Sequence, residues 1–280
     1  MLRSMIPRQA DMSAAVKSRM PRIALAATLA SATLASATLA FVLVDDHWFG
    51  RGTAELASQT RIAAPGLVRF EAPDGRRLLL ESEAHEAFFP LIAQFETQKS
   101  LAHCGPASIV MVLNALELPA PTAFGSYRRF TQDNVFDALS DPITSDRVVE
   151  RRGMALIEVA NMLRAYGLSV DAHYAGQSSI DAFRDRAAEH LGRSRSHVIV
   201  NYSRTALGQD GPGHISPLGA YDADSDRFLV LDVSRYKAPA VWVLAERLFE
   251  AMAEPIGPDA GTRGFLLIRA PPKEGSTQQF

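Results

Sequence analysis

Apolar residues recur every three to four positions in several stretches of the chain, which is the period of an α-helix. The pattern predicts helices over residues 104–116, 154–166, 179–191 and 244–252. Local signals agree with these boundaries: Pro106 suits a first helical turn, and Gly167 suits a C-cap. Ser178 or Ser179 suits the N-cap of the third helix.

β-type patterns dominate the later part of the chain. Apolar runs predict strands over residues 168–170, 197–202, 213–221, 227–234 and 263–268. The polar segment 222–226 reads as the turn of a hairpin, and a further hairpin is predicted from strands 67–70 and 77–80 around a turn at 72–75. Helices come first and strands later, which favours an α+β domain over a parallel βαβ sheet.

The first 44 residues have the pattern of an export segment. Residues 1–22 are basic and read as a cytoplasmic n-region, and residues 23–44 form an uncharged run longer than the ~18 apolar residues that mark a spanning candidate. We read 23–44 as a signal anchor, with a cleaved signal peptide left open because residues 30–32 and 35–37 both suit a peptidase. Residues 45–65 read as a linker.

Composition narrows the chemistry. The formal net charge of -2 shows no basic bias toward nucleic acid. A single cysteine, Cys104, excludes an intramolecular disulfide and any multi-cysteine metal site. We predict no metal-ligating residues in this chain.

Cys104 is the main chemical candidate. It lies at the predicted start of helix 104–116, where unpaired N–H groups and the helix dipole favour a thiolate. Gln98, six residues upstream, could donate a hydrogen bond to an oxyanion that forms beside the sulfur. The alternative is that Cys104 is a small buried apolar residue. A nucleophile also needs a base.

The hairpin around residues 222–226 supplies a candidate base. If its turn centres near residue 224, opposed residues sum to about 448, and His214 becomes a diagonal neighbour of Asp232. An imidazole and an orienting carboxylate could then meet across two strands. The alternatives are a structural strand histidine and a carboxylate that accepts turn N–H bonds. His103, His173 and His197 show no comparable partners in the sequence, and we interpret them as structural or exposed.

Several motifs occur in an order that resembles one family. They lie at residues 96–98, 102–116, 201–204, 208–209, 211–221, 231–237 and 263–265. Over residues 85–270 the chain closely resembles the catalytic domain of phytochelatin synthases. The resemblance assigns residues 66–272 to that domain, leaves 273–280 as a tail, and implies a papain-like cysteine-peptidase fold.

The resemblance also implies roles for the candidate residues. Cys104 would be the nucleophile, His214 the base and acid, Asp232 the orienting carboxylate and Gln98 an oxyanion-hole donor. The implied substrate is glutathione, whose Cys–Gly bond is cleaved through a γ-glutamylcysteinyl thioester that passes to water or to a second glutathione. By motif, further positions fall where family members contact the γ-glutamylcysteinyl unit: Asn201, Gly213 and Arg263.

The chain also departs from the plant members of this family. The last motif ends at residue 265, close to the end of the sequence, and His103 replaces a usual tyrosine. This short arrangement resembles bacterial members, in which hydrolysis tends to dominate. No cofactor is expected, and a heavy-metal ion such as Cd²⁺ would enter as a thiolate complex of the acceptor glutathione. We expect an inner-membrane protein with its domain in the periplasm, or a secreted periplasmic protein after cleavage, with a homodimer left open.

Two other functions remain open at this point. A papain-like peptidase of different specificity, for example one that trims leader peptides, would share the four catalytic residue types. An anchored binding module with an unreactive Cys104 would not be an enzyme at all. The motifs around Asn201 and Arg263 speak against the peptidase. The presence of Gln98, His214 and Asp232 speaks against the binding module.

Overall fold

The computed structural model describes residues 64–271, apart from residues 125–126, 138 and 258–260. The predicted n-region, the segment 23–44, most of the linker and the tail lie outside these described residues. Among the residues that are described, no helix is both long enough and apolar enough to cross a membrane.

A seven-stranded antiparallel sheet forms the centre of the domain, with the strand order β1-β8-β7-β6-β5-β9-β4. The strands are β1 (Val68–Arg69), β4 (Ser169–Tyr174), β5 (Ser196–Ser203), β6 (Gly213–Asp222), β7 (Arg227–Val230), β8 (Val241–Leu244) and β9 (Gly264–Arg269). A separate pair is formed by β2 (Thr122–Phe124) and β3 (Tyr127–Arg128).

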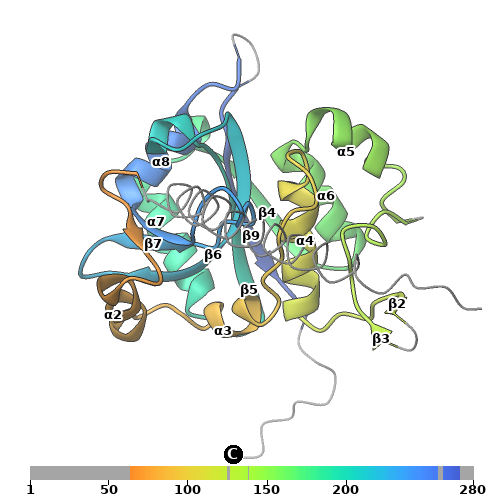
Figure 1. The fold of residues 1–280 in the computed structure, drawn as a ribbon, viewed down its shortest axis with the longest axis horizontal. Coiled ribbons are helices and arrows are strands. Elements are labelled where there is room, and N and C mark those ends of the chain that lie inside the picture. Colours follow the sequence, from red (N-terminus) through yellow and green to blue (C-terminus); the bar gives the residue numbers. More distant parts are fainter. Residues whose placement is uncertain (1–63, 125–126, 138, 258–260, 272–280) are drawn as a thin grey trace, which may run out of the picture. The chain divides into compact units, whose positions relative to one another are not determined.

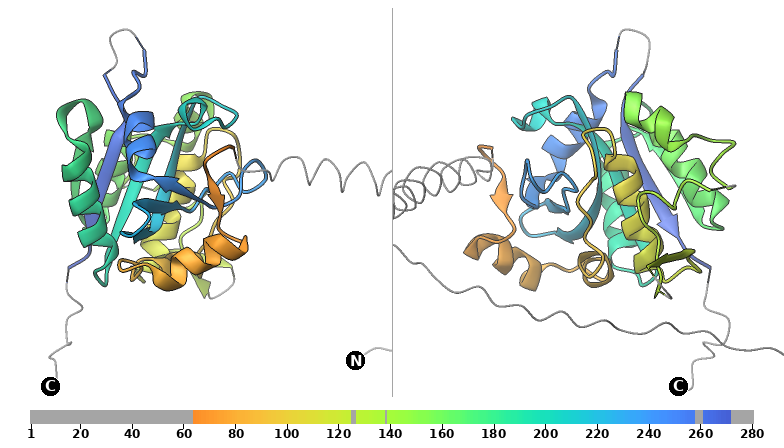
Figure 2. Two further views of the ribbon diagram at one scale, coloured as in Figure 1. Left: turned by 90° about the vertical axis from the view of Figure 1, so that its left-hand side faces the viewer. Right: turned by 45° about the vertical axis from the view of Figure 1, so that its right-hand side comes forward.

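Helices pack on both faces of this sheet (Figures 1 and 2). They are α2 (Pro73–Glu81), α3 (Phe88–Ile92), α4 (Cys104–Ala115), α5 (Asp146–Arg152), α6 (Leu156–Ala165), α7 (Ile180–Leu191) and α8 (Ala245–Ala253). Helices α4 and α6 lie on one side, with α4 against β6, while α7 and α8 lie on the other. Every residue of β5 is buried, as expected for a strand covered on both faces.

Most predicted elements are confirmed. The four helices predicted over 104–116, 154–166, 179–191 and 244–252 correspond to α4, α6, α7 and α8, and the Ser179 side chain accepts a hydrogen bond from the N–H of Ala182 as an N-cap. The strands predicted over 168–170, 197–202, 213–221, 227–234 and 263–268 correspond to β4, β5, β6, β7 and β9. Strand β7 ends at Val230, so the second half of the strand predicted over 227–234 is wrong. The α+β class is therefore confirmed. Strand β8 was not predicted.

The predicted hairpin over residues 67–80 is wrong. Its second strand is part of helix α2, and β1 pairs with β8 instead. Pro73 occupies the first turn of α2, and Arg77 forms an ion pair with Glu81 one turn later at 2.8 Å. The apolar run at 78–80 is misleading, because Leu78 is buried while Leu80 is 83% exposed.

A bulge in β6 sets the face of the sheet on which the later residues lie. Close to the turn, Asp222 pairs with Arg227, but beyond the bulge Leu218 pairs with Val230, so that Gly219 is the extra residue. Beyond the bulge, the numbers of paired residues sum to 448, the value predicted from the sequence, and this register continues toward Asp232. Without it, Asp232 would oppose Pro217 and point to the other face, because a slip of one residue exchanges the faces of a strand.

Gly219 is closely surrounded, and we expect substitution there to be costly. A Cβ atom at this position would lie 3.2 Å from Phe88 and 3.3 Å from both Leu229 and Leu231. Gly219→Ala should lower the free energy of unfolding by about 1 kcal/mol or more through overpacking, measured by urea denaturation. Gly192→Ala is the control, since its nearest new contact would be an ordinary 3.5 Å. Equal stability of the two variants would contradict the tight packing described around Gly219.

Candidate functional site

Cys104 is the first residue of α4, and its side chain is largely buried. Four residues later, the hydroxyl of Ser108 donates to the carbonyl of Cys104 at 2.8 Å and lies 3.2 Å from the carbonyl of Ile215. Ile215 follows His214 in β6. This contact fixes the N-terminus of the helix against the strand that carries the candidate base.

The predicted meeting of His214 and Asp232 is present. Nε2 of His214 lies 2.8 Å from Oδ1 of Asp232, and both side chains are buried. The contact is an ion pair whenever His214 is protonated. Asp232 lies two residues beyond the end of β7, in a segment that continues alongside β6, since the N–H of Leu231 donates to the carbonyl of Pro217.

The charges of this group depend on one another. Burial lowers the pKa of His214, but the Asp232 carboxylate and Cys104 raise it by a larger amount. The net pKa therefore lies above its ordinary value. Burial raises the pKa of Cys104, yet His214 and the backbone N–H groups of Ile215 and Gly105 bring it below its ordinary value. These opposite shifts favour a thiolate beside an imidazolium.

Arg204 is a member of the site that sequence reasoning missed. Its Nη2 lies 2.7 Å from both carboxylate oxygens of Asp232, and its side chain is only 3% exposed. The N–H of Ser234 donates to Oδ1 at 2.8 Å. Burial raises the pKa of Asp232, whereas His214 and then Arg204 lower it, to a net value of about 2. The sequence shows only that Arg204 directly follows an apolar strand, and it gives no indication that Asp232 is its partner.

Cys104 and His214 open onto a pocket of about 620 Å³ between the sheet and α5. The three predicted substrate contacts, Asn201, Gly213 and Arg263, all line it. A Cβ atom on Gly213 would lie 3.3 Å from Nε of Arg263, so the glycine lets the guanidinium approach the strand. Burial lowers the pKa of Arg263, and its Nη1 donates to the carbonyl of Glu254 at 3.0 Å.

Gln98 lies in the loop before α4 but does not line this pocket. Its Nε2 donates to the carbonyl of Ser100 at 2.7 Å and to the hydroxyl of Tyr236 at 3.0 Å, which uses both amide hydrogens. Its backbone N–H donates to the carbonyl of Val233 at 2.9 Å. Gln98 therefore ties the loop to the segment after Asp232, and its role as an oxyanion donor stays a prediction.

The expectation that His103 has no partners comparable to those of His214 is wrong. Its buried ring lies between two carboxylates of α5, with Nε2 2.9 Å from Asp146 and Nδ1 3.2 Å from Glu150. Sequence could not show this, because the partners are more than 40 residues away and lie in a segment without a clear pattern. His103 therefore joins the residue before Cys104 to α5.

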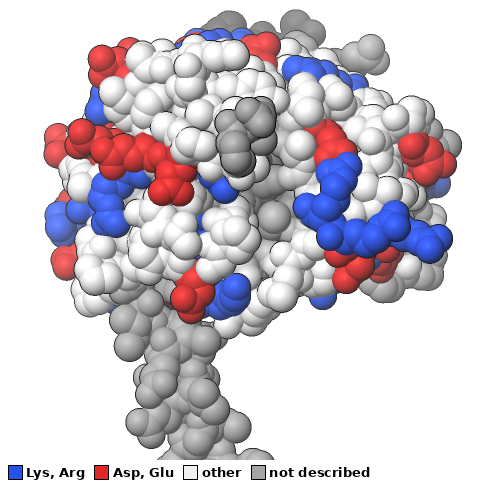
Figure 3. Space-filling model, turned by 90° about the horizontal axis from the view of Figure 1, so that it is seen from above, with Lys and Arg blue, Asp and Glu red and all other residues white. Residues whose placement is uncertain are grey.

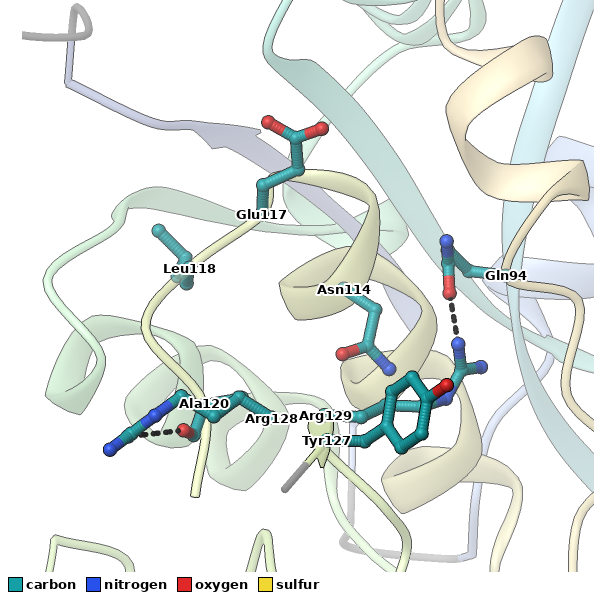
Figure 4. Close-up of a pocket in the computed structure, with 8 residues that line it drawn as sticks. All are labelled: Gln94, Asn114, Glu117, Leu118, Ala120, Tyr127, Arg128 and Arg129. Carbon is teal, nitrogen blue, oxygen red and sulfur yellow. Dashed lines mark hydrogen bonds between the residues drawn. The ribbon is translucent and has the colours of Figure 1, made fainter. Parts of the chain in front are cut away.

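A second cavity of about 480 Å³ lies at the far end of α4 (Figure 4). Its basic side chains are engaged within the protein: Arg129 contacts Gln94 and Glu96, and Arg128 donates to the carbonyl of Ala120. Tyr127, in β3, is 76% exposed. Within the described parts of the chain, no three His, Cys, Asp or Glu residues are grouped to hold a metal ion.

A lowered-pKa cysteine at a helix N-terminus, beside a histidine that contacts a buried aspartate, is the arrangement required for nucleophilic cysteine chemistry. The sequence profile of the family described as phytochelatin synthase matches residues 58–265. The chain belongs to the phytochelatin synthase family.

Similar proteins are found in plants and in a yeast. Glutathione gamma-glutamylcysteinyltransferase 1 of Lotus japonicus is 35% identical over 216 residues, covering 76% of this chain and 42% of the relative. The enzyme of the same name from Arabidopsis thaliana is 33% identical over 216 residues, covering 76% and 44%. The Schizosaccharomyces pombe protein is 30% identical over 191 residues, covering 68% and 45%. The chain thus spans less than half the length of these relatives.

The buried pair of Arg204 and Asp232 should be important for stability. Arg204→Met removes the cation and leaves a buried carboxylate with less compensation, so the free energy of unfolding should fall by about 3 kcal/mol or more, measured by urea denaturation. The double variant with Asp232→Asn should recover part of this loss, because an amide carries no charge.

A surface ion pair provides the control for this measurement. Arg193 lies 2.8 Å from Glu189, and both side chains are about half exposed. Arg193→Met should change the free energy of unfolding by at most about 1 kcal/mol. A loss at Arg204 no larger than the loss at Arg193 would show that the buried pair does not have the assigned importance.

Proposed function

We propose that this chain is a papain-like cysteine enzyme that transfers the γ-glutamylcysteinyl group of glutathione. The observation that carries the proposal is the contact of His214 with Asp232 beside a cysteine whose pKa is lowered. The names of the relatives support glutathione as the substrate. Substrate and activity are proposals for this chain because it spans less than half of those proteins.

The first half-reaction forms an acyl-enzyme. The Cys104 thiolate attacks the carbonyl carbon of the Cys–Gly amide, and a tetrahedral oxyanion forms beside the N-terminus of α4, where N–H groups lack intrahelical partners. His214 gives its proton to the glycine nitrogen, the C–N bond breaks, and glycine leaves. The γ-glutamylcysteinyl group remains on Cys104 as a thioester.

The second half-reaction removes the acyl group. His214, now neutral, takes a proton from water or from the amine of a second glutathione, and this nucleophile displaces Cys104 from the thioester. Water gives γ-glutamylcysteine, and glutathione gives a phytochelatin. A heavy-metal ion would enter as part of an acceptor thiolate complex, and therefore as substrate.

Asn201, Gly213 and Arg263 are the groups proposed to hold the γ-glutamylcysteinyl unit, since all line the pocket beside Cys104. The guanidinium of Arg263 can pair with the α-carboxylate of the γ-glutamyl group. Asp232 and Arg204 do not line the pocket. We assign Asp232 to orienting His214 and stabilising its charge, and Arg204 to holding that carboxylate in place.

The direct test uses the full chain with glutathione, with and without Cd²⁺. Glycine should be released, together with γ-glutamylcysteine or phytochelatins. Mass spectrometry of the trapped acyl-enzyme should detect one γ-glutamylcysteinyl unit on Cys104. Cys104→Ser and His214→Ala should each lower the rate by about a thousandfold or more. Glycine release that persists in Cys104→Ser would exclude the proposed nucleophile, and retained turnover in His214→Ala would mean that another base acts.

The pH dependence of kcat/KM provides a second prediction. The thiolate requires a pH above the lowered pKa of Cys104, and the imidazolium requires a pH below the raised pKa of His214, so the profile should be bell-shaped. Asp232→Asn removes the carboxylate that raises the pKa of His214, so the alkaline limb should move to lower pH. The exposed Asp185→Asn should leave the profile unchanged. An unmoved alkaline limb in Asp232→Asn would contradict the assigned ion pair.

A further inference from the structure

The pocket beside Cys104 is lined by other basic residues besides Arg263. The C-terminal end of α5 contributes Arg151 and Arg152 to its lining. Seen from above, a continuous group of Lys and Arg side chains lies on the right of the molecule, with acidic side chains beside it, and further basic side chains lie on the left (Figure 3). Cys104 thus shares its pocket with cations from two different elements.

The two arginines of α5 differ in their contacts. The guanidinium of Arg152 forms a two-point pair with Glu158, at 2.6 and 2.9 Å, so its charge is already compensated. Arg151 is exposed and makes no hydrogen bond or ion pair with another residue in the described part of the chain. Its charge therefore faces the pocket without a partner from the described protein.

Helix α5 is fixed to the segment that carries the nucleophile. Nζ of Lys99 lies 2.7 Å from Asp146, which also contacts His103. The hydroxyl of Ser100 donates to Glu150 at 3.1 Å, and Glu150 also contacts His103. His103 directly precedes Cys104, and Glu150 directly precedes Arg151. These contacts hold the backbone of Arg151 in a fixed relation to the sulfur.

We propose that Arg151 binds the glycine carboxylate of glutathione and thereby selects substrates with a free C-terminal glycine. This inference rests on the proposed function. Glutathione carries carboxylates at both ends, and if Arg263 holds the γ-glutamyl end at the sheet, the glycine end points to the wall formed by α5. A guanidinium there binds the carboxylate through charge-assisted hydrogen bonds. Because Arg151 is exposed, glycine can leave into solvent once the amide breaks.

Arg147 offers a matched control on the same helix. It lies one turn before Arg151, is exposed like it, and is absent from the lining of the pocket. Arg147→Gln and Arg151→Gln remove the same charge from α5, so a general loss of positive potential affects both. Arg151→Lys keeps the charge but loses the planar fork, and it should retain part of the effect.

The experiment compares glutathione with glutathione amide, in which the glycine carboxylate is a neutral carboxamide. γ-Glutamylcysteine is measured, because both substrates give the same acyl product on hydrolysis. For glutathione, Arg151→Gln should raise KM about tenfold, and Arg147→Gln should leave it nearly unchanged. For the amide, the unsubstituted enzyme should already show the raised KM, and Arg151→Gln should change it little.

Two results would overturn the inference while the proposed function stands. One is an equal KM for glutathione in Arg151→Gln and Arg147→Gln. The other is an equal loss with glutathione and with its amide, which would show that the carboxylate is not the group that Arg151 binds. If the unsubstituted chain forms no γ-glutamyl product from glutathione, the proposed function fails, and this inference fails with it. Matching thermal unfolding of the variants excludes misfolding as the cause.

Discussion

The charge of Asp232 is the constraint on which the site depends. A fully buried carboxylate is costly unless it is paired, and here a guanidinium, an imidazole and a backbone N–H surround it. Arg204 balances the carboxylate permanently, so Asp232 stays ionised and can support a positive His214. That positive histidine in turn favours the thiolate of Cys104. The charge state of Cys104 therefore depends on Asp232, which acts on it through His214.

The fold brings these groups together through two independent devices. Within the sheet, the extra residue Gly219 turns Asp232 toward the face that carries His214. Between the layers, Ser108 holds the N-terminus of α4 against β6, which places Cys104 beside the same histidine. The first device sets the charge of the base, and the second sets its distance from the nucleophile. Loss of the first would leave His214 without its carboxylate, and loss of the second would move Cys104 away from His214.

Sequence reasoning succeeded where the determining interactions are local. Cys104 could be placed by helical periodicity and Pro106, and the His214–Asp232 contact followed from the length of one hairpin. The prediction centred the turn at residue 224 and did not include the bulge. The bulge shifts the pairing register by one residue, and this shift makes the prediction correct near Asp232. Long-range contacts could not be read in this way: Arg204, the carboxylates around His103 and the pairing of β1 with β8 join segments far apart in sequence. The run at 78–80 failed because a short apolar stretch fits a helix as well as a strand.

The groups that control the charge of Cys104 and the exposed cations of its pocket lie on different elements, and His103 joins the nucleophile segment to the second of these. The sheet side of Cys104 carries the groups that set its protonation, and these are buried and fully engaged. The α5 side is joined to the nucleophile loop through His103, Ser100 and Lys99, and it presents exposed cations to the pocket. Substitutions on the exposed face of α5 can therefore change which substrates are held without disturbing the buried charges. His103 thus acts as a structural link between the nucleophile segment and α5.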